Sequence, residues 1–328
     1  MGGRGVHVLQ TTSVLHSPGA VGTRPSNFRH ISRSWTPHSP SVRRTSISAG
    51  ASAQPLEAEL SGMPAQWDTS TSFSLDNVRS SLIRQEDTTL FNLIERAQFA
   101  RNSAVYTAEA IPVPGFSADG SRLSLLEYVL RGTEQLHGKI RRFTSCDEHA
   151  FYPNELPPLV LPPIKYPDVL PPSAHKVNVN DKIMNLYKNV ILPGITVDGD
   201  DGNYGSASMY DVFCLQALSR RIHFGKFVAE AKFRADPELY TALIKKEDAD
   251  GIMKLLTNRA VEEKVIERVR LKAVTYGQDP EAAANGECTY KVEPSVVADL
   301  FDQWIMPLTK EVQVECLLRR FEDSNGDP

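Results

Sequence analysis

The first 56 residues of this 328-residue chain contain no Asp or Glu, and the first acidic residue is Glu57. The segment has six Arg and no Lys, is rich in Ser, Thr and small residues, and shows no helical period of apolar residues. Such a composition cannot form a core, and it is typical both of organellar transit peptides and of generic disorder. We expect a disordered transit peptide at 1–56, with a processing region at 46–54, and a linker at 57–72. The Ser and Thr content favours plastid (chloroplast stroma) over mitochondrial localisation.

Cysteine and long apolar runs are also scarce. The four cysteines, Cys146, Cys214, Cys288 and Cys316, form no CxxC pair and have no metal-ligand spacing. We therefore expect a reducing compartment, no disulfide framework and no metal site. No apolar run approaches the ~18 residues that a membrane-spanning helix needs, so no membrane partner is expected.

Positive charge is under-represented in the rest of the chain. Outside the first 56 residues, 30 basic residues stand against 40 acidic ones, a net charge of −10. Nucleic-acid-binding surfaces are basic, because they must neutralise phosphates. We therefore expect no nucleic-acid partner.

Apolar residues recur at helical spacing almost everywhere from about residue 73 onward, and no convincing strand alternation occurs. The pattern predicts an all-α, single multi-helix domain over 73–322 and a tail at 323–328. The first helix begins near Leu75, with Ser74 or Asp76 as its N-cap. Further helices are predicted at 123–143, 180–191, 237–244, 249–256, 261–276, 294–302 and 309–321.

Four local predictions are specific enough to test. In the helix at 123–143 the residues expected to face inward are Leu126, Val129, Leu130, Leu136 and Ile140. The helix at 180–191 should start at Asn180 or Asp181. The segment 153–172 contains eight prolines and must be non-helical. The run at 198–206 is a glycine-rich acidic loop, after which Ser206 should cap a long helix.

That long helix contains the most informative stretch, QALSRRIHFGKFVAEAKFR at 216–234. Arg221 and Lys232 are eleven residues apart, about three turns, so both lie on one stripe with Gly225 between them. Gly225 costs helix stability, about 1 kcal/mol relative to Ala, but leaves room for something to dock. The alternative is a solvated basic face with an accidental glycine. His223 lies off the stripe and is expected to be a packed or capping residue.

Two more helices carry polar pairs at the same kind of spacing. Asn258 and Glu262 are separated by four residues, as are Thr309 and Gln313, which interrupt an aliphatic face. Arg79 shares a face with Glu86. Each pair alone is more often a surface hydrogen bond or a cap than a site. Together they offer cations and neutral donors without a nucleophile, which suits clamping a small polyanion and stabilising charge that develops in a transition state.

The chain resembles the eukaryotic, all-helical chorismate mutases of plants and fungi. The resemblance is carried by LIRQED, RRF…DEHAFYP, DGNYGS, LSRRIHFGKFVAEAKF, AVEEKV…ER and PLTKEVQVECLLRR, and runs from about Leu75 to Phe321. It implies an isomerase that converts chorismate to prephenate by a Claisen rearrangement, in phenylalanine and tyrosine biosynthesis, without a cofactor. The N-terminal segment resembles that of plastid-targeted plant members.

The resemblance also implies roles for the residues found above. Arg79, Arg221 and Lys232 would bind the two carboxylates and the ether oxygen of chorismate. Asn258 and Glu262 would contact the ring carboxylate and hydroxyl, and Thr309 and Gln313 would complete the pocket. Fungal members have Glu at the position of Gln313. Because an amide donates a hydrogen bond at any pH, activity is expected to persist at mildly alkaline pH.

A second implied site is allosteric. Trp, Tyr or Phe would bind at the interface of a homodimer, with Trp activating and Tyr and Phe inhibiting. One subunit would contribute Asn203, Gly205 and Ser206 and the other Arg141 and Arg142, and free N–H groups at a helix N-terminus suit a carboxylate. The alternatives are an unregulated isoform and a non-catalytic regulatory homologue. A helical scaffold protein and a chorismate-using lyase are further alternatives.

Overall fold

The structure is a computed structural model that describes residues 74–112, 122–164, 166, 168–278, 285 and 289–322. The predicted transit peptide, linker and tail lie outside these residues, as does Cys288. Within them every regular element is helical and the sole bridge joins Gln278 and Tyr290, which confirms the all-α prediction. None of the described helices combines the length and the apolarity that a bilayer crossing requires.

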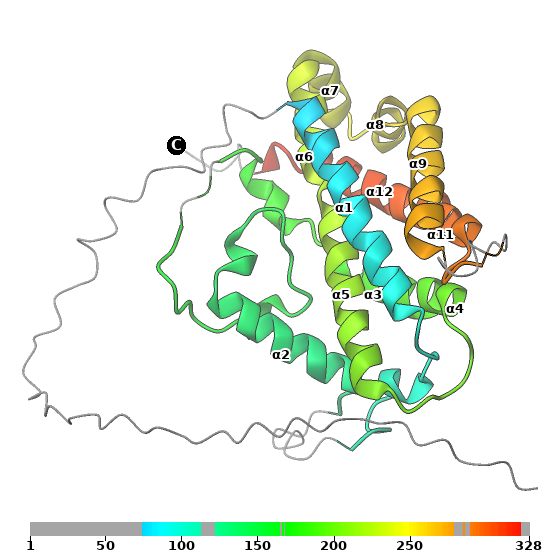
Figure 1. Cartoon of the computed structure of the whole chain (residues 1–328). Coiled ribbons are helices and arrows are strands. Elements are labelled where there is room, and N and C mark those ends of the chain that lie inside the picture. Colours follow the sequence, from blue (N-terminus) through cyan, green and yellow to red (C-terminus); the bar gives the residue numbers. More distant parts are fainter. Residues whose placement is uncertain are drawn as a thin grey trace, which may run out of the picture. The chain divides into compact units, whose positions relative to one another are not determined.

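Two consecutive helices, α5 (Tyr204–His223) and α6 (Gly225–Ala235), form the centre of the helical body (Figure 1). Phe224, which joins them, keeps right-handed helical backbone angles, so the predicted helix at 216–234 is nearly continuous. The first long helix, α1 (Leu75–Arg96), packs along α5 and α6, and α2 (Leu125–Lys139) packs on α5. The remaining helices are α7 (Pro237–Ile244), α8 (Ala249–Leu256), α9 (Arg259–Gly277), α11 (Pro294–Leu300) and α12 (Met306–Leu318).

Short elements complete the body. They are α3 (Asn180–Leu186), α4 (Leu192–Ile195), and the 3₁₀ turns η4 (Ser103–Tyr106), η6 (Arg142–Thr144), η7 (Pro153–Glu155) and η8 (Pro172–Lys176). The proline-rich segment is therefore almost free of helix, as predicted, apart from the single turn η7 and the start of η8. Ser74 is the N-cap of α1, its side chain accepting from the N–H of Asn77.

The main core runs along α5, where Leu215, Leu218 and Ile222 are fully buried. A buried ion pair lies beside it: Arg96 Nε donates to Asp211 Oδ1 at 2.5 Å, and both side chains are fully buried. Tyr187 also donates to Asp211, at 2.6 Å. The pair thus joins α1, α5 and the segment after α3 in one hydrogen-bonded network, and sets how these helices lie against each other.

Two helices are longer than predicted because a wide turn precedes a proline in each. Tyr187–Ile191 and Phe301–Ile305 are π-helical, and the N–H groups of Leu192 and Met306 reach back five residues. Pro193 and Pro307 follow directly. A proline ring clashes with the carbonyl four residues earlier and removes a donor, so the helix widens locally instead of ending. The predicted helices at 294–302 and 309–321 are therefore one continuous helical run, as are residues 180–195.

The inward face of α2 differs from the predicted one. Leu126 and Leu130 are buried as expected, but Leu136 and Ile140 are 61% and 49% exposed. The buried stripe instead continues through Glu134 and Gly138. The Glu134 carboxylate accepts the N–H groups of two residues of the following loop, at 2.8 and 3.0 Å. A buried acid that binds backbone donors was invisible to a pattern based on hydrophobicity.

One predicted helix start is confirmed and another is wrong. The helix predicted to start at Asn180 or Asp181 begins at Asn180, with Val179 in the N-cap position and no side-chain cap among the described residues. The long helix begins at Tyr204, so Ser206 lies in its first turn and Asn203 takes the N-cap position without a side-chain hydrogen bond. The preceding loop is instead ordered by Asp201, which accepts the N–H groups of Ala100 and Asn203.

Candidate functional site

The predicted stripe on α5 and α6 faces α12 at Gly225. A Cβ atom built at Gly225 would lie 2.7 Å from the carbonyl oxygen of Thr309 and 3.4 Å from Cγ of Gln313. The glycine therefore does leave room, and the element that occupies this room is the backbone of α12. This contact brings Thr309 and Gln313 against the stripe between Arg221 and Lys232.

Arg221 is a buried cation at one end of this stripe. The residue is 4% exposed, and its Nε and Nη1 atoms find no hydrogen-bond acceptor within the described residues. Burial lowers the pKa of Arg221 to about 10, Glu86 favours its charged form and Arg268 opposes it. A buried guanidinium with unmatched donors is costly unless an anion joins it. Its geometry is therefore that of an anion-binding group.

Lys232 lies at the other end and gathers charged groups from three further helices. Burial lowers its pKa; Arg79 of α1 and Lys310 of α12 lower it further, while Glu262 of α9 raises it. Its Nζ donates to the carbonyl oxygen of Leu256 at 2.7 Å. The structure thus brings three of the predicted site residues, Arg79, Lys232 and Glu262, into one electrostatic neighbourhood.

The two predicted residues at the start of α9 differ in how they are held. Asn258 is the N-cap of the helix and its side-chain oxygen accepts from the N–H of Val261 at 3.2 Å, so its amide group is directed by the cap. Glu262 pairs with Lys310 at 3.0 Å. The two side chains were expected to share a helix face, but Asn258 precedes the first turn of α9 and only Glu262 lies within the helix.

Thr309 and Gln313 are both buried on α12, 6% and 5% exposed. The Thr309 hydroxyl donates to the carbonyl of Ile305 at 2.6 Å, and Gln313 Nε2 donates to the carbonyl of Thr309 at 3.2 Å. An amide nitrogen carries two N–H donors, so Gln313 keeps one that its own helix does not use. Its Oε1 is buried and has no partner within the described residues.

Charged residues that the sequence analysis did not identify surround the predicted site residues. Arg268 of α9 binds buried Glu86 of α1 through two nitrogens, at 2.7 and 2.9 Å, and Lys272 binds the same carboxylate at 3.2 Å. Lys310, adjacent to Thr309, holds Glu262. The spacing of four residues between Arg268 and Lys272 indicates that both lie on one face of the helix. Which acidic residue these two cations contact depends on how α1 and α9 pack.

The five residues of the predicted allosteric site fall into two separate groups. Arg142 contacts α5 near its middle, donating to Gln216 Oε1 at 2.6 Å, and pairs with Glu148 at 3.1 Å. Arg141 has left-handed backbone angles and donates to the carbonyl of Pro162. Asn203, Gly205 and Ser206 are exposed at the start of α5. Gln216 and Gly205 are eleven residues apart on one helix, roughly 16 Å, so the structure does not bring the two groups together within one chain.

His223 is packed, as predicted. It is fully buried, and its Nε2 accepts from the N–H of Val179 at 3.0 Å. Cys214 and Cys316 are likewise buried. Nowhere in the described ranges do three His, Cys, Asp or Glu side chains gather as a metal site would need.

Comparisons with known proteins identify the family. The family model for chorismate mutase type II matches residues 203–314. A Petunia hybrida protein named chorismate mutase 1, chloroplastic, is 49% identical over 82% of this chain and 84% of its own length. The Saccharomyces cerevisiae chorismate mutase is 47% identical over 77% of this chain and 97% of its own length.

Two solved structures are similar as well. Aro7p chorismate mutase from Candida albicans, in complex with L-Trp, has a TM-score of 0.72 and 45% identity, covering 77% of this chain and 94% of that one. AtCM1 with tyrosine bound in its allosteric site has a TM-score of 0.70 and 49% identity, covering 77% and 99%.

Proposed function

Because this chain belongs to the type II chorismate mutases, we propose that it is an isomerase that converts chorismate to prephenate by a Claisen rearrangement. The observation that carries the proposal is Arg221, a buried guanidinium with two donor nitrogens unpartnered within the described residues. Chorismate brings two carboxylates, and its rearrangement needs no nucleophile and no cofactor. The protein must therefore bind chorismate and hold it in the reactive conformation.

The residues around Gly225 suit that work. Arg221 and Lys232 are about 16 Å apart along the helix axis, with Gly225 and the α12 pair between them. In the proposed complex Arg221 and Arg79 bind carboxylates, and Asn258 and Glu262 contact the ring substituents. Lys232 and Gln313 donate to the ether oxygen, on which negative charge develops as the C–O bond breaks. Donors that are fixed before the reaction stabilise such charge most effectively.

Turnover of chorismate by the full chain tests this proposal. Arg221→Ala should lower kcat/KM by about 10²-fold or more, the usual effect of removing one fixed donor to developing or bound negative charge. Arg220→Ala is the matched control, because Arg220 is exposed and pairs with Asp147 at 2.6 Å, away from the stripe. Circular dichroism verifies that both variants fold. Equal turnover by wild type and Arg221→Ala, or none by a folded wild type, would remove the proposal and favour the non-catalytic homologue.

The regulatory proposal is that Trp, Tyr and Phe bind between two copies of the chain. Its support is geometric: Gln216, which Arg142 contacts, lies about 16 Å along α5 from the exposed turn at Asn203, Gly205 and Ser206. For this reason we place the two groups that hold one amino acid on different subunits. We expect Arg142→Ala to abolish the response of turnover to Tyr and Trp. Isothermal titration that detects no binding of the three amino acids to wild type would contradict the site.

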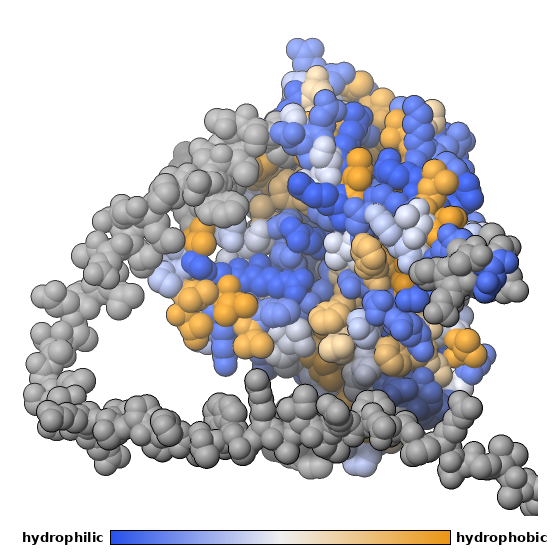
Figure 2. Space-filling model, in the orientation of Figure 1, coloured by the Kyte–Doolittle hydropathy of each residue, from blue (hydrophilic) through white to orange (hydrophobic). Residues whose placement is uncertain are grey.

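The homodimer required by that site is supported by an apolar surface near the end of α2. The N–H of Val160 donates to the carbonyl of Lys139, which places Leu159, Val160 and Leu161 beside Ile140. All four are exposed, Val160 by 67%, and hydrophobic side chains gather over this end of α2 on the left of Figure 2. Patches of this kind mark interaction sites. Sedimentation of the full chain as a monomer at micromolar concentration would exclude the dimer.

We also propose plastid localisation, supported by the acid-free segment 1–56 and by relatives named chloroplastic in Petunia hybrida and Zea mays. A fluorescent protein carrying residues 1–56 should accumulate in the stroma of plant cells. A diffuse cytosolic signal would overturn this localisation.

A further inference from the structure

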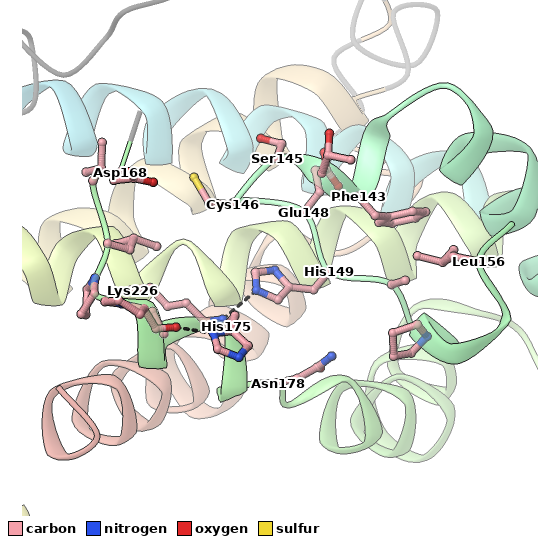
Figure 3. A pocket seen from close by; sticks show the side chains of 18 residues that line it. Phe143, Ser145, Cys146, Glu148, His149, Leu156, Asp168, His175, Asn178 and Lys226 are labelled. Atoms are coloured by element: carbon pink, nitrogen blue, oxygen red, sulfur yellow. Dashed lines mark hydrogen bonds between the residues drawn. The ribbon is translucent and has the colours of Figure 1, made fainter. Parts of the chain in front are cut away.

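A cavity lies beside α6 at Lys226. It has a volume of about 420 Å³ and is lined by residues of the segments 143–156 and 168–178 together with Lys226 (Figure 3). None of the twelve residues predicted for the active or allosteric site lines it. Its volume is within the range of ligand-binding pockets, about 300–1,000 Å³.

Lys226 is the cation of this cavity. It is 1% exposed, and its Nζ donates to Nε2 of His149 at 2.7 Å (Figure 3). Within the part of the chain that the structure describes, no carboxylate lies within ion-pair distance of it. Glu315, the acid whose field reaches Lys226, is itself paired with Arg319 at 3.2 Å. The ammonium group is thus buried with a neutral imidazole as its partner.

The groups near Lys226 do not neutralise it. Burial lowers the pKa of His149 to about 2 and that of His223, stacked on it at 4.1 Å, to about 3, so both rings are neutral at physiological pH. Cys146 and Cys316 are thiols with raised pKa values because of burial. Burial lowers the pKa of Lys226 itself to about 8, so the amine is still mainly protonated at pH 7. A buried positive charge of this kind is stabilised by an anion that enters beside it.

The other residues that line the cavity indicate which kind of anion would bind there. The walls are mixed: Phe143, Leu156, Val169 and Leu170 form an apolar part, and polar side chains that include the exposed Asp168 form the rest. Glu148 is engaged by Arg142 and Arg220, at 3.1 and 3.5 Å, which leaves little reason for it to attract a cation. We propose that this cavity binds a small carboxylic acid with an apolar body, whose carboxylate accepts a hydrogen bond from Lys226 Nζ while the body packs against Phe143 and Leu156. The proposal goes beyond the isomerase reaction and does not depend on it.

Chemical labelling of the full chain tests it at a single residue. Cyanate adds to an uncharged amine and forms a urea with no leaving group. Because burial lowers its pKa to about 8, Lys226 has a larger uncharged fraction at pH 7.5 than an ordinary lysine. Peptide mass spectrometry compares its labelling rate with and without benzoate, a small aromatic carboxylate, and with inorganic phosphate as the comparator. Exposed Lys254 on α8 is the reference amine.

We expect cyanate to label Lys226, and saturating benzoate to slow this labelling at least tenfold without affecting Lys254. An unlabelled Lys226 would mean that solutes do not reach the cavity, and labelling that benzoate leaves unchanged would mean that no carboxylate pairs with it; either overturns the proposal. Protection by phosphate but not by benzoate would overturn the choice of an apolar carboxylate. Protection confined to Lys232 would place the acid at the active-site cluster, against the proposal.

A variant gives an independent measurement. Lys226→Met removes the charge and keeps an unbranched apolar side chain, so the part of the benzoate-induced rise in Tm that comes from this cavity should disappear. Lys176→Met, which removes an exposed charge on η8 paired with Glu322, should leave the rise unchanged. An unchanged rise in Lys226→Met would overturn the proposal. If that variant does not fold, protection from cyanate in the wild type decides alone.

Discussion

Replacing Gly225 with Ala sets two effects on stability against each other. Ala is a better helix former than Gly by about 1 kcal/mol in a helix interior. The added Cβ, however, would lie 2.7 Å from the Thr309 carbonyl oxygen and 3.1 Å from its Cγ2 atom. The oxygen belongs to the backbone of α12, so the clash is relieved only if α6 and α12 move apart. Overpacking of this kind typically costs about 1–3 kcal/mol.

We therefore expect Gly225→Ala to lower the free energy of unfolding by up to about 2 kcal/mol, and Tm by up to about 8 °C. The same shift displaces Thr309 and Gln313 from the stripe, and a displacement near 1 Å can lower turnover about 10²-fold. Urea unfolding followed by circular dichroism measures the first effect, and chorismate consumption measures the second.

Gly132 provides the matched control. It lies in the interior of α2 and is exposed, and no atom of the described residues lies within 4 Å of an added Cβ. Gly132→Ala should therefore show the helix-forming gain alone, about 0.5–1 kcal/mol of added stability, with unchanged turnover. If Gly225→Ala proves as stabilising as Gly132→Ala, the close approach of α6 and α12 is absent and the role assigned to Gly225 is wrong.

Three further predictions concern buried polar groups. Gln313→Glu should make turnover fall as pH rises through neutrality, since a carboxyl group donates a hydrogen bond only when protonated and burial raises its pKa; a pH profile identical to that of wild type would refute the amide's role. Asp211→Asn should lower the free energy of unfolding by about 3–5 kcal/mol, because Arg96 keeps a buried charge without its counter-ion; a loss below about 1 kcal/mol in urea unfolding would contradict this. Burial lowers the pKa values of His149 and His223, so below about pH 6.5 these histidines bind protons in the unfolded chain but not in the folded one. As the pH falls, each histidine therefore decreases the free energy of unfolding by about 1.4 kcal/mol per pH unit, until its folded pKa is reached. His223→Gln should remove one such contribution between pH 6 and 4, and an unchanged slope of unfolding free energy against pH would refute it.

The helices themselves were largely predictable, because apolar period and capping residues act over a few neighbouring positions. Ser74 is a clear case: a hydroxyl before a periodic segment is the ordinary start of a helix. The predictions that proved wrong rested on local sequence patterns, but contacts with residues far away in the sequence decided the structure there. Ser206 looks like a cap, yet the loop before it is ordered by Asp201, which binds Ala100 about a hundred residues away in sequence. Leu136 and Ile140 continue an apolar stripe that the packing of α2 leaves exposed.

The site shows the same division. The spacing of Arg221 and Lys232 placed both on one stripe, and the four-residue pairs placed Thr309 with Gln313, because helix geometry fixes which residues share a face. Spacing within a helix says nothing about which other helix lies opposite. The pairing of Glu86 with Arg268, and the cavity around Lys226, join segments far apart in sequence and have no local signal.

The sequence by itself thus determined the helices, the stripe of cations and the family, since each depends on residues close together in the chain or on long matching segments. Only the tertiary structure decided that α12 fills the space above Gly225, that Arg221 is buried with donors that no described residue accepts, and that Lys226 faces a cavity. The physical reason is that burial and charge pairing depend on distances between helices, and packing of whole side-chain surfaces sets those distances.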